Sequence, residues 1–177
     1  MTIVTVTAGH SNSDPGACAF GRRESDIAVD MREMVKVYLE REGLTVRTDG
    51  DDRKENQTLS EAIRLIKGSK LAVEFHCNAF SKPTAGGTEV LAQDKDKAIA
   101  KAICKAISET MGIAVRGADG GWKSEGSGQH SRLGYVRNGG LIIELFFISN
   151  PNELKVWDEK KWLVAKAVAK AIIDHVK

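Results

Sequence analysis

The chain has 177 residues, of which 42% are hydrophobic and 28% charged, the balance of an ordinary globular domain with a substantial core. A net charge of +2 is too small to indicate a nucleic-acid partner. The sequence also lacks an apolar run long enough to cross a bilayer, so we expect no membrane insertion.

The cysteines and the N-terminus favour a reducing compartment. Cys18, Cys77 and Cys104 are an odd set without CxxC spacing, so neither a disulfide framework nor a cysteine zinc site is expected. The first strand starts at Ile3 and no basic segment precedes it, which argues against a secretory signal. We therefore expect synthesis in the cytoplasm.

Strand and helix patterns alternate along the chain. The expected elements, in order, are a strand over 3–7, a helix over 24–42, a strand over 44–48, a helix over 58–67, strands over 71–76 and 87–92, a helix over 94–111, a strand over 141–147 and a final helix over about 160–176. Strands separated by helices indicate βαβ units. We predict an α/β fold in a single domain, with a mostly parallel twisted sheet flanked by helices on both faces.

One stretch does not fit this alternation. Residues 112–140 are rich in glycine and show little apolar periodicity. A loop of this length inside a compact domain is usually functional.

Four polar residues stand where predicted strands end or a helix begins. His10 follows the first strand, Glu24 opens the first helix, His76 closes the 71–76 strand, and Glu144 closes the apolar run 141–143. The carboxyl ends of parallel strands line the ligand crevice of an open α/β sheet. Two imidazoles and a carboxylate that meet there would make a three-ligand metal site, with the second carboxylate left as a base.

Each of these residues, taken alone, has a simpler explanation. A histidine at the end of a buried strand is more often structural than a ligand, and Glu24 suits a helix N-terminus in any protein. Glu144 is harder to explain structurally, because an unpaired charge within an apolar strand is costly. All four together favour a catalytic zinc site, since His, Glu and His donors prefer zinc to magnesium or calcium. The chemistry that fits is metal-assisted hydrolysis of an amide, in which Glu144 carries the proton from water to the leaving amine.

Several motifs in this order resemble a known family. They are Ala8-Gly9-His10, Asp14-Pro15-Gly16-Ala17 leading to Glu24, Glu74-Phe75-His76-Cys77-Asn78-Ala79, Gly87-Thr88-Glu89, and Glu144-Leu145-Phe146-Phe147-Ile148-Ser149-Asn150. The chain is similar to the zinc-dependent N-acetylmuramoyl-L-alanine amidases of the Amidase_3 family, in their compact, endolysin-like form. The correspondence extends over nearly the whole length.

The resemblance implies a role for each of the four residues. His10, Glu24 and His76 would hold one Zn²⁺ ion, and Glu144 would be the catalytic carboxylate. The substrate would be peptidoglycan or muropeptides, cut at the amide between the lactyl group of N-acetylmuramic acid and L-alanine of the stem peptide. Residues 1–177 would be one catalytic domain without a separate wall-binding module. The departures, including Leu145 for a glycine and Glu74 for a small polar residue, bear on substrate fit more than on metal binding.

Residues around the centre have two explanations each. Glu74 shares a sheet face with His76 and would either orient that imidazole or pair with an arginine. Cys77 is expected to pack as a small hydrophobic residue. His130, in the glycine-rich loop, would border the cleft or be merely exposed. Arg137, like Arg22, Arg23 and Arg132, would meet carboxylates of the stem peptide or be surface charge.

Two other functions are compatible with the pattern. One is a different zinc peptidase or carboxypeptidase acting on wall peptides, and the other is a catalytically inert relative that only binds peptidoglycan. We expect a monomer with an open site. Compact members of the family include phage and prophage lysis enzymes and sporulation amidases released when the mother cell lyses. Of these two roles we favour the first, and we expect the protein to act on the cell wall after release, in cell lysis.

Overall fold

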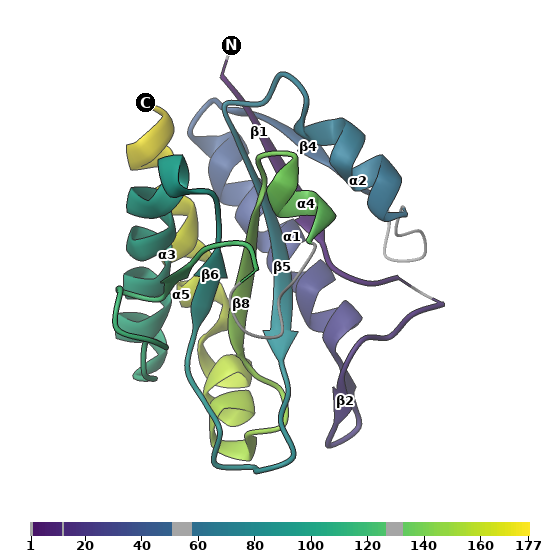
Figure 1. Ribbon diagram of the computed structural model, residues 1–177, viewed down its shortest axis with the longest axis vertical. Helices are drawn as coiled ribbons and strands as arrows, with labels where there is room; N and C mark the ends of the chain where they lie inside the picture. Colours follow the sequence, from purple (N-terminus) through teal and green to yellow (C-terminus); the bar gives the residue numbers. More distant parts are fainter. Residues whose placement is uncertain (1, 12, 51–57, 127–132) are drawn as a thin grey trace.

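Six strands form one twisted sheet in the order β4-β1-β5-β8-β6-β7 (Figure 1). The computed structural model describes residues 2–11, 13–50, 58–126 and 133–177. The strands of this sheet are β1 (Ile3–Ala8), β4 (Thr45–Thr48), β5 (Leu71–Asn78), β6 (Glu89–Leu91), β7 (Trp122–Lys123) and β8 (Leu141–Phe147). Every neighbouring pair is parallel except β6 with β8. The prediction of a mostly parallel sheet is confirmed.

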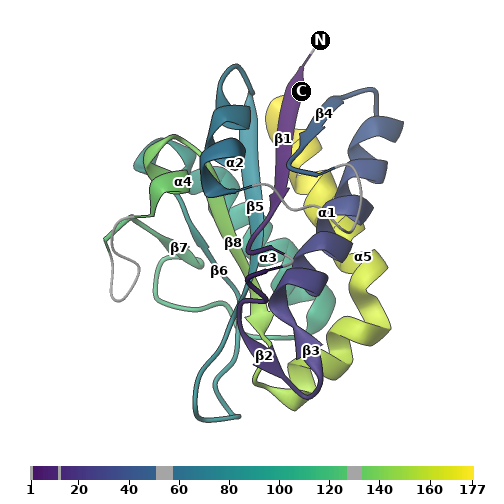
Figure 2. The same cartoon turned by 90° about the vertical axis from the view of Figure 1, so that its right-hand side faces the viewer.

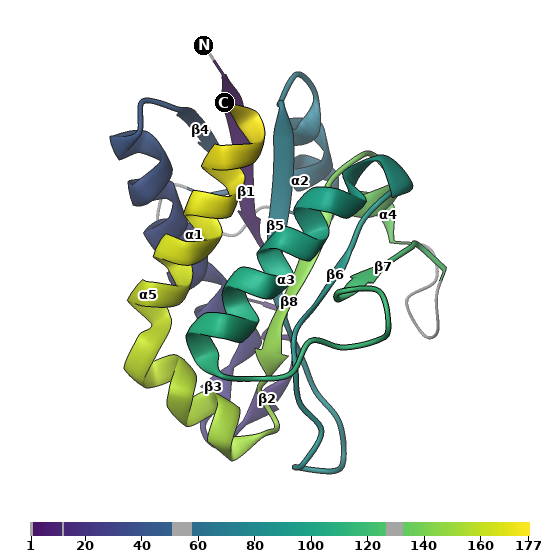
Figure 3. The same cartoon turned by 90° about the vertical axis from the view of Figure 1, so that its left-hand side faces the viewer.

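Helices cover both faces of the sheet. The helices are α1 (Glu24–Arg41), α2 (Leu59–Ile66), the 3₁₀ turn η1 (Asp94–Asp96), α3 (Lys97–Met111), α4 (Gly134–Arg137) and α5 (Pro151–Val176). The long helices α1, α3 and α5 pack together on one face, and the short α2 and α4 lie on the other (Figures 2 and 3). Within the described residues, no helix combines the length and the apolar character that a bilayer crossing requires.

The two faces have hydrophobic cores of unequal size. The larger core lies under the three long helices and includes Val73, Phe75 and Ile143. The smaller one, beneath α2 and α4, includes Ala72 and Tyr135. Since α2 has eight residues and α4 has four, they cover only part of their face. Beyond these helices, Glu74, His76 and Glu144 lie on this face of the sheet, and they belong to the site described below.

A buried ion pair fixes the end of β1. Arg32 of α1 is fully buried, and its Nη1 lies 2.8 Å from Oδ1 of Asp49, which is 1% exposed. The Asp49 carboxylate also accepts a hydrogen bond from the backbone N–H of Ala8, at 3.2 Å to Oδ2. The pair therefore joins α1 to the last residue of β1, two positions before His10.

Two expectations about the elements were wrong, and one element was not predicted. The segment 112–140 is not a featureless loop, because it contributes β7 to the sheet edge and α4 to the smaller core. The last helix begins at Pro151 rather than near residue 160, because the Asn150 side chain accepts hydrogen bonds from the N–H groups of Asn152 and Glu153 and so caps it there. A two-stranded hairpin, β2 (Cys18–Ala19) with β3 (Arg22–Arg23), precedes α1 and had no hydrophobic pattern to reveal it.

Candidate metal centre and catalytic carboxylate

The structure brings three of the four predicted residues to one point. Oε1 of Glu24 lies 3.0 Å from Nε2 of His10 and 3.0 Å from Nδ1 of His76. One ligand atom from each residue lies within 4.8 Å of the others. Two imidazole nitrogens and a carboxylate oxygen this close are the donor set of a three-ligand zinc site.

Glycines allow the chain to bring these side chains together. A Cβ on Gly9 would overlap the ring of His76, and a Cβ on Gly16 would lie 2.6 Å from both the Glu24 carboxylate and the His10 ring. His10 itself has φ of +67°, in the left-handed region that non-glycine residues rarely occupy. Positions 9 and 16 therefore have no room for a Cβ atom.

Glu24 is the central member of the cluster. It is the first residue of α1 and is 4% exposed. Its Oε1 also accepts the N–H of Cys77 at 3.0 Å, and its Oε2 accepts the N–H of Ala17 at 2.9 Å. Burial raises its pKa, but hydrogen bonds from His10 and His76 outweigh burial and hold the pKa below its ordinary value. Glu24 is therefore anionic at neutral pH.

Each histidine has a carboxylate on its second ring nitrogen. Nδ1 of His10 lies 3.0 Å from Oδ2 of Asp14, and Nε2 of His76 lies 3.1 Å from Oε1 of Glu74. Ligating histidines usually have such partners, which fix the ring orientation and tautomer. Of the two expectations for Glu74, the structure shows the contact with His76. Asp14 was not predicted as part of the site, although its place in the 14–17 turn, four residues after His10, was a usable signal.

The carboxylates also alter the acidity of both histidines. The hydrogen bond to Glu24 raises the pKa of His10. Burial lowers the pKa of His76, but hydrogen bonds to Glu24 and Glu74 outweigh it and leave the pKa well above its ordinary value. A metal ion and a proton would compete for the same nitrogen lone pairs in this cluster.

Glu74 is held in turn from β1. Oγ1 of Thr7 donates a hydrogen bond to Oε2 of Glu74 at 3.0 Å, and it also lies 3.1 Å from the hydroxyl of Tyr135 in α4. All three side chains are buried. A continuous polar contact therefore runs from α4 through β1 to the second nitrogen of His76.

Glu144 lies beside the cluster in an unusual environment. It is paired in register with His76 of β5 and with Glu89 of β6, so the three side chains share one face of the sheet. It is 8% exposed, and its Oε2 has no hydrogen-bond partner among the described residues. Burial, assisted by the charges of Glu24 and Glu89, raises its pKa to about 7. Such a carboxyl group can both accept and return a proton near neutral pH.

The predicted strand over 141–147 is confirmed, but Glu144 lies in its middle and not at a strand end, as had been expected. β8 continues to Phe147, and every one of its residues is buried. The strand continues because Leu145 and Phe146 pack into the larger core, where Phe146 stacks on Trp157 of α5. Glu144 reaches the site from the middle of a strand because α2 and α4 leave that face uncovered.

Glu89, in contrast, has its charge compensated. Its carboxylate accepts hydrogen bonds from Nδ2 of Asn78 at 3.0 Å and from Nε of Arg116 at 2.9 Å, and it pairs with Nζ of Lys123. Burial raises the pKa of Glu89, but these partners outweigh it and lower the pKa overall. In the row His76–Glu144–Glu89, Glu144 thus lacks the cationic side-chain contacts that Glu89 has among the described residues.

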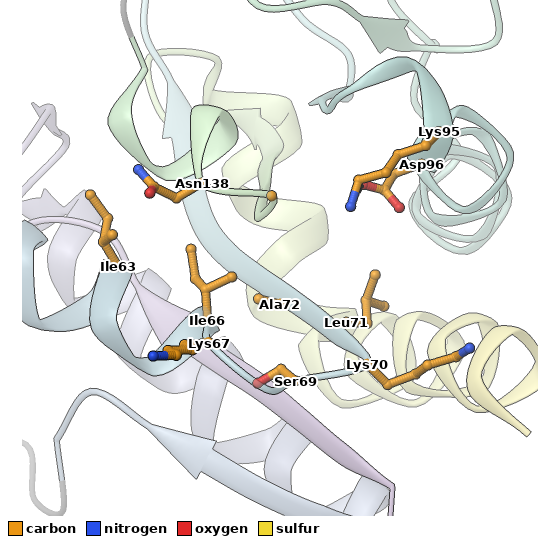
Figure 4. A pocket seen from close by; sticks show the side chains of 11 residues that line it. Ile63, Ile66, Lys67, Ser69, Lys70, Leu71, Ala72, Lys95, Asp96 and Asn138 are labelled. Carbon is orange, nitrogen blue, oxygen red and sulfur yellow. Dashed lines mark ion pairs between the residues drawn. The ribbon is translucent and has the colours of Figure 1, made fainter.

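A cavity of about 250 Å³ opens beside the three-donor cluster. His10, His76 and Glu74 form one side of it, and Leu59 and Ala62 of α2 form the other. A larger cavity of about 450 Å³ lies where β5 begins, at the opposite edge of the sheet, between Ile66, Lys70 and Asn138 (Figure 4). It contains none of the four predicted residues.

None of the other predicted residues that the structure describes is among the three clustered donors. Arg137 ends α4, is 54% exposed and pairs with Glu125. Arg22 pairs with Asp158 and Arg23 with Asp26. Cys77 is buried in the larger core, as expected. His130 and Arg132 lie outside the described residues.

Comparisons with known proteins agree with this geometry. The Amidase_3 family, described as N-acetylmuramoyl-L-alanine amidase, matches residues 4–174. The chain is similar to the germination-specific N-acetylmuramoyl-L-alanine amidase of Bacillus subtilis strain 168, with 24% identity over 98% of this chain and 79% of that protein.

Solved structures show the same relationship. A candidate N-acetylmuramoyl-L-alanine amidase from Neisseria meningitidis is 44% identical, with a TM-score of 0.90 over 98% of this chain and 95% of that one. The catalytic domain of the amidase CwlV from Bacillus (Paenibacillus) polymyxa has the same fold, with a TM-score of 0.81 at 20% identity over 100% of both chains. Because the family matches almost the entire length of this chain, the chain belongs to the Amidase_3 family of N-acetylmuramoyl-L-alanine amidases.

Proposed function

We propose that this enzyme is a zinc-dependent peptidoglycan amidase that cleaves the bond between the lactyl group of N-acetylmuramic acid and L-alanine of the stem peptide. One observation carries the proposal. Glu144, a buried carboxyl whose Oε2 has no hydrogen-bond partner among the described residues, is in register with His76, a member of a three-donor cluster. A buried acid of this kind is costly to the fold and is typical of a functional group.

The donor set fits one zinc ion. His10, Glu24 and His76 supply two neutral nitrogens and one anionic oxygen, a combination that suits zinc and that magnesium and calcium do not favour. A bound zinc ion would act as a Lewis acid that polarises the scissile carbonyl and makes water more acidic. Asp14 and Glu74 would hold the two imidazoles in the orientation and tautomer that ligation needs.

Glu144 moves the proton in the proposed reaction. A pKa of about 7 leaves a large fraction of the group ionised at neutral pH, ready to take a proton from the attacking water. The water oxygen bonds to the carbonyl carbon, the carbon–nitrogen bond breaks, and the protonated Glu144 returns the proton to the leaving nitrogen. The products are a lactyl carboxylic acid and a stem peptide with a free L-alanine amine.

The identity of the products tests this proposal. Purified sacculi are digested with the zinc-loaded enzyme, and the new termini are identified by mass spectrometry, with the Glu144→Gln variant as control. The amidase predicts new lactyl carboxyls and free L-alanine amines, with peptide cross-links intact. Release of a free amino acid would instead identify a carboxypeptidase. Binding to sacculi without any product would identify an inert relative.

The biological setting is a separate proposal. We propose that residues 1–177 act as a monomeric catalytic unit in cell lysis, after release from the cytoplasm. The support is the resemblance to compact lysis enzymes of the family. Expression in a bacterial cytoplasm should leave cells intact until the membrane is permeabilised chemically, and then the culture should clear. Clearing without permeabilisation, or no clearing after it, would count against this setting.

A further inference from the structure

The turn between β2 and β3 carries a residue that the turn itself disfavours. The register of Ala19 with Arg22 leaves a two-residue turn of Phe20 and Gly21, whose φ angles are +50° and +72°. Two positive φ values define a type I′ hairpin turn, in which asparagine, aspartate or glycine is preferred at the first position. A phenylalanine in this conformation is strained.

The packing of the fold gives no reason for this choice. Phe20 is 62% exposed, so its ring contributes little to the core. Among the described residues, the other non-glycine residue with positive φ is His10, a member of the metal cluster. Backbone strain concentrates at functional sites, and local rules broken without a folding benefit mark them. Phe20 therefore calls for a functional explanation.

The hairpin is rigidly attached to the metal cluster. The N–H of Glu24 donates to the carbonyl of Ala17 at 2.9 Å, which continues the hairpin ladder into the ligand residue. The guanidinium of Arg22 binds both carboxylate oxygens of Asp158 in α5, at 2.7 and 2.8 Å. Phe20 is four residues from Glu24, so their Cα atoms are separated by at most about 14 Å. The exposed ring is thus held near the reacting centre.

A second exposed phenylalanine stands in an equivalent place. Phe80 is 54% exposed and follows His76 by four residues, with the same upper limit of about 14 Å. Its N–H donates to Oγ of Ser149 at 2.9 Å, which fixes the loop after β5. Figures 1 and 2 show the β2–β3 hairpin and this loop extending from the same edge of the molecule. In contrast, the exposed Trp162 and Leu163 lie on α5.

We propose that Phe20, together with Phe80, contacts sugar rings of the glycan strand that adjoin the scissile amide; this inference rests on the proposed function. The acyl side of that amide is a saccharide, whose ring has a face of C–H groups. A neutral phenyl ring offers no hydrogen bonds but packs against such an apolar face. Two rings, each four residues from a proposed metal ligand, would position the glycan strand. Part of the binding energy would then lower the barrier to cleavage.

The first test uses the conflict between turn preference and substrate contact. Phe20→Asn places the preferred residue at the first turn position, so the melting temperature should rise by about 2–4 °C. In the same variant, kcat/KM on sacculi should fall about three- to tenfold. A structural role for the ring predicts the opposite sign for stability. Phe80→Ser should lower kcat/KM similarly, and Trp162→Gln, an exposed aromatic on α5, should leave it unchanged.

The second test needs no catalysis. Metal-free protein is co-sedimented with glycan strands from which the stem peptides have been removed, and binding of Phe20→Asn is compared with that of Trp162→Gln. Loss of binding in Phe20→Asn alone supports the inference. Equal binding of both variants, or binding only to peptide-bearing fragments, overturns it. If the native enzyme cleaves no sacculi but Phe20→Asn alone loses glycan binding, the proposed function fails and the glycan contact stands.

Discussion

Glu144 of β8 and His76 of β5 lie directly opposite each other on these parallel strands. Neighbouring strands lie about 4.8 Å apart, so the sheet itself sets the separation between the proposed base and a proposed metal ligand. Neither residue depends on a flexible loop for this relationship. The relative position of these two residues is therefore set by strand register.

Glu144→Gln should abolish most activity without releasing the metal. Glutamine keeps the shape of the side chain but cannot accept and return a proton, so kcat should fall by about 10²- to 10⁴-fold. Zinc content, measured by elemental analysis after gel filtration, should stay at the native level because Glu144 is not among the three clustered donors. Substantial activity in this variant would show that another group carries the proton.

The same substitution should stabilise the metal-free protein at alkaline pH. In the native fold the pKa of Glu144 is raised from 4.5 to about 7, so the folded state binds the extra proton between those values and loses stability as pH rises through them. Between pH 5 and pH 8, the advantage of Glu144→Gln should grow by about 2–3 kcal/mol of unfolding free energy. Urea denaturation at the two pH values measures this change. A constant difference would mean that the pKa is not raised.

Zinc should stabilise the protein through the three clustered donors. At a zinc concentration 100-fold above Kd, the gain is about 2.7 kcal/mol, or about 5–10 °C in melting temperature for a chain of this size. His76→Ala should remove most of this shift and the activity, whereas His175→Ala, an exposed histidine near the end of α5, should change neither. An undiminished shift in His76→Ala would place the metal elsewhere.

Glu74 and Asp14 should differ in their effect on metal affinity. Loss of a partner on the second nitrogen of a ligating histidine typically weakens metal binding about 10- to 100-fold. Glu74 has a side chain that is 7% exposed, whereas that of Asp14 is 65% exposed. We therefore expect Glu74→Gln to weaken zinc binding more than Asp14→Asn, in competition with a chelating dye. Glu109→Gln, on the exposed face of α3, is the control, and equal affinities for all three variants would contradict the assignment.

The buried pair Arg32–Asp49 should matter to stability more than any surface pair. Arg32→Met leaves Asp49 charged and buried, which should cost about 3–5 kcal/mol in urea denaturation. Adding Asp49→Asn should recover part of the loss, because the amide oxygen can still accept the N–H of Ala8. Arg41→Met, at the exposed end of α1, should change stability by no more than about 0.5 kcal/mol. A similar small loss in Arg32→Met would show that the pair contributes little.

The sequence was informative wherever periodicity and strand ends carried the signal. The alternation of apolar strands with amphipathic helices predicted the parallel sheet, and residues that follow β1 or begin α1 were correctly expected to meet, as His10 and Glu24 do. The start of α5 was missed because a capping side chain, Asn150, determines it, and apolar periodicity does not mark the first residue of a helix.

Long-range contacts were the part that local patterns could not predict. The compensation of Glu89 by Arg116 and Lys123 depends on the arrangement of β6, β7 and the segment between α3 and β7. The raised pKa of Glu144 likewise depends on its burial in the folded sheet, near the charges of Glu24 and Glu89. Such relationships arise from tertiary packing, and no spacing along the chain encodes them.

The close approach of Gly9 to the His76 ring predicts which substitutions position 9 can tolerate. Any side chain at position 9 would occupy the volume of that ring, and so would displace a residue 67 positions away in the sequence. In a saturation mutagenesis library selected for activity, position 9 should accept glycine alone, while the nearby positions 8 and 11 should accept small alternatives to Ala8 and Ser11. The positions that tolerate no side chain would identify the residues packed against the three-donor cluster, without any measurement of metal.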